Sequence, residues 1–149
     1  MRQIFFTGIL GLAVTNDYKY LITQRNQPQN PEIHKRWQIP GGGVEYGKQP
    51  EETLFRELEE ELTLKPLILF PNPIVKTQVW QRKSSAIHLT LACYIISIGH
   101  QKPIINDRET LDWRWVTKSE LYRIDCLPLT KVFIDETDQI CNRYSLLSS

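Results

Sequence analysis

Three glutamates close together in the chain, Glu57, Glu60 and Glu61, have the type and spacing of metal ligands. They lie in a segment predicted to be helical, residues 50–62, where about 100° per residue places all three within roughly 100° of arc. Like charges at these spacings repel each other, and negative charge near the C-terminal end of a helix opposes the helix dipole. Because carboxylate oxygens are preferred ligands of Mg²⁺ and Mn²⁺, we interpret the stripe as a metal site. A solvated acidic helix face is the alternative interpretation.

A glycine turn precedes this helix, at Pro40-Gly41-Gly42-Gly43. Successive glycines allow a close approach of the backbone and can direct a carbonyl or an amide toward a metal or a phosphate. We therefore expect the Gly41 carbonyl to assist the glutamates in metal binding, although such a run taken alone favours a simple tight turn. Together, the turn and the helix predict a cradle for a metal-bound diphosphate.

Residues 42–64 resemble the Nudix box. That pattern runs glycine, five residues, glutamate, seven residues, Arg-Glu, an aliphatic residue, any residue, Glu-Glu, any residue, glycine and an aliphatic residue. The positions that match it in register are Gly42, Arg56, Glu57, Leu58, Glu60, Glu61 and Leu64. The Pro40-Gly41 lead-in and Val44-Glu45-x-Gly47 also look like the family. Beyond the box, residues 20–25 and 113–121 resemble it too, so the resemblance covers most of the chain, but only the box is specific.

The resemblance implies a hydrolase that uses Mg²⁺, with Mn²⁺ as a substitute, and cleaves the diphosphate linkage of a nucleoside di- or triphosphate or a nucleoside diphosphate joined to another group. It implies that Glu57, Glu60 and Arg56 are catalytic, with Arg56 orienting Glu57. Glu57, Glu60, Glu61 and Gly41 would hold the metal, and Glu57 or Glu60 would position or deprotonate the attacking water. An ordinary ion pair of Arg56 on the helix surface is the alternative.

Two positions depart from the box. Lys48 stands where the family has its first glutamate, which in the family supports the metal and its water shell. Lys48 would therefore either weaken metal binding or contact a phosphate of the substrate. Thr63 replaces a glycine that eases the end of the helix, and β-branched residues tolerate a positive φ poorly. The Arg-Glu-x-x-Glu-Glu core is complete, so the sequence favours an active enzyme.

Residues outside the box are weaker candidates for substrate binding: Arg25 for a phosphate, Trp37 for stacking on a base, and Glu109 as a further carboxylate. Loop cations such as Arg25 are usually only solvated. Trp37 could equally have a packing role. Glu109 and Asp112 lie just before and at the start of the last predicted strand, where relatives supply another metal carboxylate, but either could be an ordinary loop charge.

Apolar and alternating runs predict the elements that must position these residues. The predicted strands span residues 4–14, 18–23, 36–39, 67–70, 74–81, 86–98 and 111–116, with the first two joined as a hairpin through residues 15–17. The predicted helices span residues 50–62 and 129–143, with a short one ending at Tyr122 and capped by Thr117 or Ser119. This order predicts an α/β (α+β) fold, an α/β/α sandwich with a mixed central sheet between helices, in a single domain over residues 1–149.

Length, charge and cysteine usage exclude several other classes of protein. The 149 residues suit one domain, and a net charge of +1 with a pI near 7.7 gives no field that would recruit a nucleic-acid polymer or an anionic membrane. The apolar run over residues 4–14 is too short to span a bilayer, which needs about 20 residues. Three cysteines without CxxC spacing favour a reducing cytoplasm. The expected partner is a small nucleoside diphosphate derivative, and a homodimer is left open.

Two rival functions fit parts of the sequence. A catalytically weak or silent module that binds a nucleotide or sugar nucleotide would account for Lys48 and Thr63. An isomerase of prenyl diphosphates, which has a related fold, would need a cysteine near the active site, and none lies in or near the box.

Overall fold

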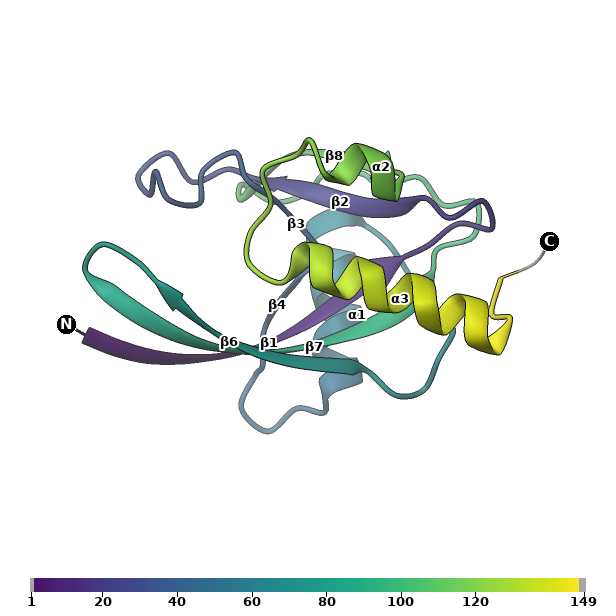
Figure 1. Ribbon diagram of the computed structural model, residues 1–149, viewed down its shortest axis with the longest axis horizontal. Helices are drawn as coiled ribbons and strands as arrows, with labels where there is room; N and C mark the ends of the chain where they lie inside the picture. Colours follow the sequence, from purple (N-terminus) through teal and green to yellow (C-terminus); the bar gives the residue numbers. More distant parts are fainter. Residues whose placement is uncertain (1, 148–149) are drawn as a thin grey trace.

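The computed structural model describes residues 2–147 and arranges them as two β-sheets between helices (Figure 1). The larger sheet is mixed, with the order β4-β1-β7-β5 and with β6 also paired to β7, and the smaller one is antiparallel, with the order β3-β2-β8. The strands of the larger sheet are β1 (Arg2–Ala13), β4 (Gly41–Gly43), β5 (Leu67–Ile68), β6 (Ile74–Gln81) and β7 (Ser85–Ser97). Those of the smaller sheet are β2 (Tyr20–Arg25), β3 (Trp37–Gln38) and β8 (Thr110–Val116). The helices are α1 (Pro50–Leu62), α2 (Lys118–Leu121) and α3 (Thr130–Tyr144).

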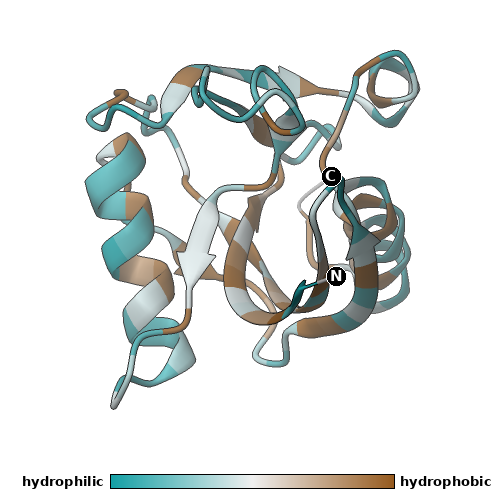
Figure 2. Cartoon of the chain, turned by 90° about the vertical axis from the view of Figure 1, so that its left-hand side faces the viewer, coloured by the Kyte–Doolittle hydropathy of each residue, from teal (hydrophilic) through white to brown (hydrophobic). Residues whose placement is uncertain are grey.

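The two long helices, α1 and α3, lie on opposite sides of the sheets (Figure 2). Successive side chains of a strand point to opposite faces, so β1 contributes to a core on each side. Leu12 packs in the cluster that contains Phe133 of α3, and Ala13 packs in the cluster that contains Leu58 of α1. The predicted α/β/α sandwich is therefore confirmed, with the difference that the sheet is divided in two.

The predicted hairpin between the first two strands is wrong. The turn itself forms, because the Tyr18 N–H donates to the Thr15 carbonyl at 3.0 Å. However, β1 and β2 belong to different sheets and are bridged only at Val14 and Tyr20 within the described residues. Instead, β1 pairs in parallel with β7 along its whole length and with β4 at residues 8–10.

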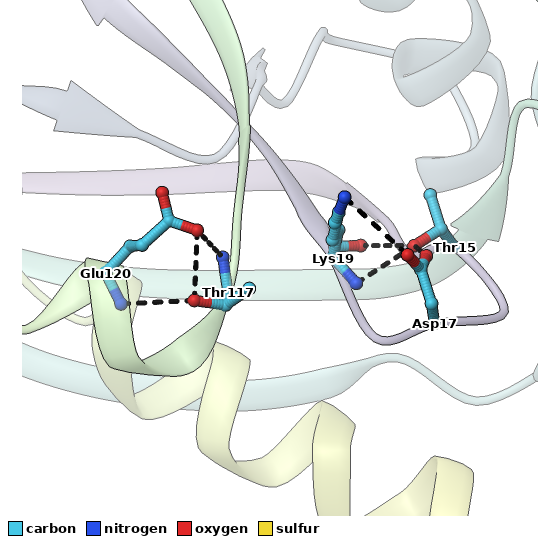
Figure 3. A network of polar contacts seen from close by, with 5 residues as sticks. All are labelled: Thr15, Asp17, Lys19, Thr117 and Glu120. Atoms are coloured by element: carbon cyan, nitrogen blue, oxygen red, sulfur yellow. Dashed lines mark hydrogen bonds and ion pairs between the residues drawn. The ribbon is translucent and has the colours of Figure 1, made fainter.

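The short helix α2 follows β8, and side-chain hydrogen bonds at Thr117 stabilise its N-terminus. The Thr117 side chain accepts a hydrogen bond from the Glu120 N–H at 3.2 Å, and the Glu120 carboxylate accepts from the Thr117 N–H at 3.1 Å (Figure 3). This reciprocal pair is a capping box, in which a side chain satisfies N–H groups that the first helical turn leaves free. Of the two predicted caps, Thr117 is the one that forms.

The packing of α1 on β1 fixes the position of the box. A Cβ atom at Gly11 would lie 2.7 Å from Leu54 Cδ1 and 3.1 Å from Leu58 Cδ1, so only glycine allows this approach. Leu54 and Leu58 are fully buried on the inner face of the helix. The glutamates on the neighbouring stripe are thereby held at a fixed distance from the glycine strand β4.

All three cysteines are free, two of them buried, as the absence of a cysteine framework in the sequence predicts. Within residues 2–147, no helix is both long and apolar enough to cross a membrane.

Thr63 ends α1 in the left-handed conformation, with φ 58° and ψ 41°. Its N–H donates to the Glu59 carbonyl at 3.0 Å, and its hydroxyl donates to the Ile104 carbonyl at 3.2 Å. The left-handed region is unfavourable for a residue with a branched Cβ, so Thr63 is strained at the position where the Nudix box has glycine.

Replacing Thr63 with glycine tests this strain. Glycine removes a penalty of about 1–2 kcal/mol, and the lost hydroxyl contact and the added freedom of the unfolded chain offset part of that gain. We expect Thr63→Gly to be more stable than Thr63→Ala, which also lacks the hydroxyl but keeps a Cβ, by about 1 kcal/mol in chemical denaturation. Equal stability of the two variants would show that the helix end is not strained.

Candidate active site

The glycine strand β4 lies directly against the carboxylate stripe of α1. A Cβ atom at Gly42 would lie 2.4 Å from Glu57 Cδ and 2.5 Å from Glu57 Oε1. At Gly41, where φ is +156°, a Cβ atom would lie 2.1 Å from the Ile9 carbonyl oxygen. The Glu57 side chain is only 17% exposed. The glycines thus form a short strand, rather than only a turn, and bring the backbone into contact with a catalytic candidate.

Arg56 is bound by three carboxylates at once. Its Nε donates to Glu45 at 2.6 Å, its Nη1 to Glu60 at 2.6 Å and its Nη2 to Glu57 at 2.7 Å. The hydrogen bond with Glu45 is the largest cause of the raised pKa of Arg56, which keeps the guanidinium charged. Arg56 therefore contacts Glu57, as the predicted orienting role requires, and also forms an i,i+4 ion pair with Glu60. Charged, planar contacts of this kind hold carboxylates in defined orientations.

Glu61 lies on the more buried side of the stripe, beside Glu57. Burial raises the pKa of the Glu61 carboxyl to about 9, with the hydrogen bond and the charge of Glu57 and the charge of Asp107 acting in the same direction. Arg25 acts in the opposite direction. Burial and the neighbouring carboxylates thus favour the protonated form of the Glu61 carboxyl. The repulsion inferred from the sequence is therefore present in the fold.

Two polar atoms beside Glu61 lack the partners that buried groups normally have. Asp107 Oδ1 and Arg25 Nε are buried, and neither has a hydrogen-bond partner in the described part of the chain. Unpaired buried polar atoms are rare and commonly mark a place for a water or an ion. Asp107 is therefore a candidate metal ligand, and Arg25 a candidate contact for a charged ligand.

Sequence reasoning gave Glu45 no role beyond its place in the family resemblance, and it missed Asp107. Asp107 is brought to the site by backbone contacts at the end of α1, where the Asn106 N–H donates to the Glu61 carbonyl at 3.0 Å. Asp107 lies in a loop whose residue types show no periodic pattern, and its place just before β8 was the only sequence signal for it. Glu109, the carboxylate predicted there, is exposed, and so is Asp112. Glu109 contacts a neighbouring loop through its backbone carbonyl.

The remaining predicted residues occupy different surroundings. Lys48 is exposed in the turn before α1. Trp37 is half-buried, packs against the core that contains α3, and has the Arg114 guanidinium 5.5 Å from its ring centroid. It is not among the residues that line the neighbouring cavity, whereas Gln38, the next residue along β3, is.

A cavity of about 340 Å³ adjoins the carboxylates. Most of its wall is apolar, and Arg25, Gly41 and Gly42 connect it to the charged cluster. The side chains and glycines that line it include Ile4, Phe6, Leu10, Arg25, Ile33, Gln38, Gly41, Gly42, Trp80, Arg82, Leu89 and Leu127. Its size is within the usual range for a small-molecule site.

The donor set suits a hard divalent cation, which prefers oxygen ligands. Across residues 2–147, no group of three or more acidic, histidine or cysteine side chains is already assembled for a metal. Arg56 binds one oxygen each of Glu57 and Glu60. The excess of negative charge around one guanidinium, the raised pKa of Glu61 and the unpaired Asp107 oxygen are all conditions that a cation would relieve.

The contact between Gly42 and Glu57 gives a direct test. A methyl group in Gly42→Ala would displace the Glu57 carboxylate, and misplacement of about 1 Å can cost about 100-fold in rate. We expect that loss in the turnover of a nucleotide substrate, with the fold preserved because Glu57 ends in a flexible side chain. Gly43→Ala is the matched control, since its nearest neighbour would be Phe6 at 3.4 Å. Equal activity of the two variants would contradict the assigned geometry.

Comparisons with known proteins identify the family and the fold. The NUDIX domain family model matches residues 6–135. The putative 8-oxo-dGTP diphosphatase 2 of Mycobacterium tuberculosis (strain CDC 1551 / Oshkosh) is 31% identical over 146 residues, which cover 95% of this chain and 92% of that protein. The MutT NUDIX hydrolase from Burkholderia pseudomallei is similar in structure, with a TM-score of 0.69 at 19% identity, covering 88% of this chain and 96% of the other. The NUDIX domain of Shewanella oneidensis NrtR, solved complexed with ADP ribose, has a TM-score of 0.67 at 16% identity, covering 93% and 88%. The chain therefore belongs to the Nudix hydrolase family.

Proposed function

We propose that this protein uses Mg²⁺, or Mn²⁺ in its place, to hydrolyse the diphosphate linkage of a small nucleoside di- or triphosphate derivative. The observation that carries the proposal is the junction of an apolar cavity with a carboxylate cluster, through Arg25, Gly41 and Gly42. A nucleotide has the same two parts, a flat base with large apolar faces and a chain of charged phosphates. The geometry suits a ligand whose base enters the cavity while its phosphates face α1.

The residues that would hold the cation are Glu57, Glu60 and Glu61, with Asp107 added by the structure and the Gly41 carbonyl kept as a prediction. A cation bound there would neutralise phosphate oxygens and lower the pKa of a water. Glu57 or Glu60 positions the attacking water and accepts its proton. Arg56 holds both carboxylates in place and is not itself among the residues that line the cavity.

Arg25 is the cation best placed to contact the phosphates. It lines the cavity and acts electrostatically on Glu61, so it lies between the apolar wall and the acidic cluster. Its Nη2 donates to Gln27 at 2.5 Å, whereas its buried Nε has no partner among the described residues. A phosphate oxygen would satisfy that donor.

The 31% identical diphosphatase makes oxidised and ordinary deoxynucleoside triphosphates the first substrates to examine. A panel with nucleoside triphosphates, nucleoside diphosphate sugars and dinucleoside polyphosphates, with products identified by mass, would show which linkage is broken.

A binding module without turnover is the second candidate. It is favoured by the state of the carboxylates, two of which are engaged by Arg56, and by the absence of an assembled three-ligand group in the described part of the chain. The NUDIX domain of NrtR, a protein of the same fold, has been solved in complex with the nucleotide derivative ADP ribose. Ligand binding without release of phosphate, pyrophosphate or nucleoside monophosphate across the panel would support this candidate.

Single glutamate-to-glutamine variants distinguish the proposed catalytic glutamates of α1 from other glutamates of the same helix. We expect Glu57→Gln and Glu60→Gln to lower kcat by about 100-fold or more, because each loses the charge that binds the cation or accepts the proton. Glu59→Gln is the control, since Glu59 is exposed on the same helix and its recorded helix-end contact uses its backbone carbonyl. Circular dichroism would verify that all three variants are folded. Wild-type rates in both Glu57→Gln and Glu60→Gln would refute the assigned roles.

A further inference from the structure

We propose that Glu32 and Arg82 form a latch at the apolar cavity, and that this latch determines how tightly the enzyme holds its substrate. The closed latch keeps residues 26–36 against the turn between β6 and β7. When the latch opens, the loop moves away and the cavity wall loses one of its sides. This role rests on the proposed function, because the occupant of the cavity is taken to be the base of a nucleotide.

The latch joins the two sheets across the cavity. Glu32 belongs to the loop between β2 and β3 of the smaller sheet, and Arg82 belongs to the turn between β6 and β7 of the larger sheet. Both segments lie at the same end of the molecule, opposite the turn where β1 and β2 are bridged at Val14 and Tyr20 (Figure 1). The sheets are therefore linked at one end by the chain itself and at the other end by side chains.

The contacts of the latch are charged and numerous. The Arg82 Nε donates to Glu32 Oε2 at 2.9 Å, and its Nη2 donates to Asn30 Oδ1 at 2.8 Å. The other Glu32 oxygen accepts a hydrogen bond from the Lys83 N–H at 3.2 Å. The hydrogen bond with Arg82 is the largest cause of the lowered pKa of the Glu32 carboxyl, so the carboxylate is charged at neutral pH. Both side chains are half-buried, and water screens their attraction less than in a fully exposed pair.

The same two segments supply facing parts of the cavity wall. Arg82 and Trp80 line the cavity from the larger sheet, with the guanidinium 5.0 Å from the centroid of the Trp80 ring. Ile33 lines it from the loop and is the only buried residue in the range 26–36. Because Ile33 follows Glu32 directly in the chain, a movement that separates Glu32 from Arg82 also withdraws Ile33 from the wall.

Residues 26–36 form a compact loop whose ends are close together. The Lys35 N–H donates to the Arg25 carbonyl at 2.9 Å, and inside the loop the Gln27 N–H donates to His34 Nδ1 at 3.0 Å. Loops closed in this way are frequently functional, and a few residues at their ends can absorb a movement of the whole segment. Arg25, the candidate phosphate contact, lies at this closed end, so the position of the loop also affects the charged part of the site.

Glu32→Gln tests the latch and leaves the cavity wall intact. Glutamine has nearly the same size but no charge, and Ile33, Trp80 and Arg82 are unchanged. We expect the KM for a deoxynucleoside triphosphate to rise about tenfold, because a charge-assisted hydrogen bond that holds the loop is lost. We expect kcat to stay nearly the same, because the latch contributes to binding and not to the reacting geometry. In the background of Arg82→Met, the Glu32→Gln change should cost nothing further.

Glu136→Gln is the matched control. It loses the same charge and breaks another half-buried ion pair, that of Glu136 with Lys76 between α3 and β6, and Glu136 does not line the cavity. Amide hydrogen exchange followed by mass spectrometry provides a readout that does not need turnover. Residues 26–36 should exchange about tenfold faster in Glu32→Gln than in the wild type and at the wild-type rate in Glu136→Gln.

The outcomes distinguish the latch from the proposed function. Equal exchange of residues 26–36 in the wild type and in Glu32→Gln would overturn the latch, with or without turnover. Faster exchange with an unchanged KM would overturn its role in holding the substrate, and so would a lower KM, which would show that Glu32 keeps Arg82 away from the ligand. If the wild type hydrolyses no nucleotide, the proposed function fails, and the calorimetric affinity for the same triphosphate takes the place of KM.

Discussion

Repulsion among carboxylates on one stripe of α1 is the constraint on which the rest of the site depends. Glu57, Glu60 and Glu61 share a few ångströms of helix surface, and the dipole of α1 opposes negative charge near its C-terminal end. Two features reduce this repulsion. The Arg56 guanidinium binds three carboxylates, and the pKa of the Glu61 carboxyl is raised. Three carboxylates against one guanidinium still leave excess negative charge, which a divalent cation would balance.

The carboxylate cluster is positioned by two glycines at which the backbone lies unusually close to side chains. Gly11 lets α1 pack on the central strand β1, and Gly42 lets β4 lie against the Glu57 carboxylate. The same β4 glycines line the apolar cavity, so one short strand separates the charged cluster from the space proposed for the base. Packing and chemistry are thereby coupled, since a change at Gly42 would reach both.

Much of this arrangement was predictable because it depends on local periodicity. The helix predicted over residues 50–62 is confirmed at both ends, and so is the strand over residues 74–81, because apolar spacing and a proline at the helix start are local signals. The contacts of Arg56 with its own helix follow from the same periodicity.

What could not be predicted depends on contacts between distant segments. Glu45 and Asp107 come from loops whose conformation no repeat of residue types specifies, and they reach the site through backbone hydrogen bonds to β1 and to the end of α1. The pairing of β1 with β7 rather than with β2 is likewise a matter of sheet topology. Trp37, a reasonable base-stacking residue by type, packs in the core because β3 presents Gln38 to the cavity.

The central claim is that the acidic stripe of α1 binds a divalent cation. Titration of the purified wild-type protein with Mn²⁺, followed by electron paramagnetic resonance with thermal unfolding in parallel, tests it most directly. The account predicts saturable binding at or below millimolar Mn²⁺, with a Tm that rises with Mn²⁺ concentration because the ion binds the folded state. An unchanged Mn²⁺ signal and an unchanged Tm at millimolar concentration, with nucleotide present, would contradict it.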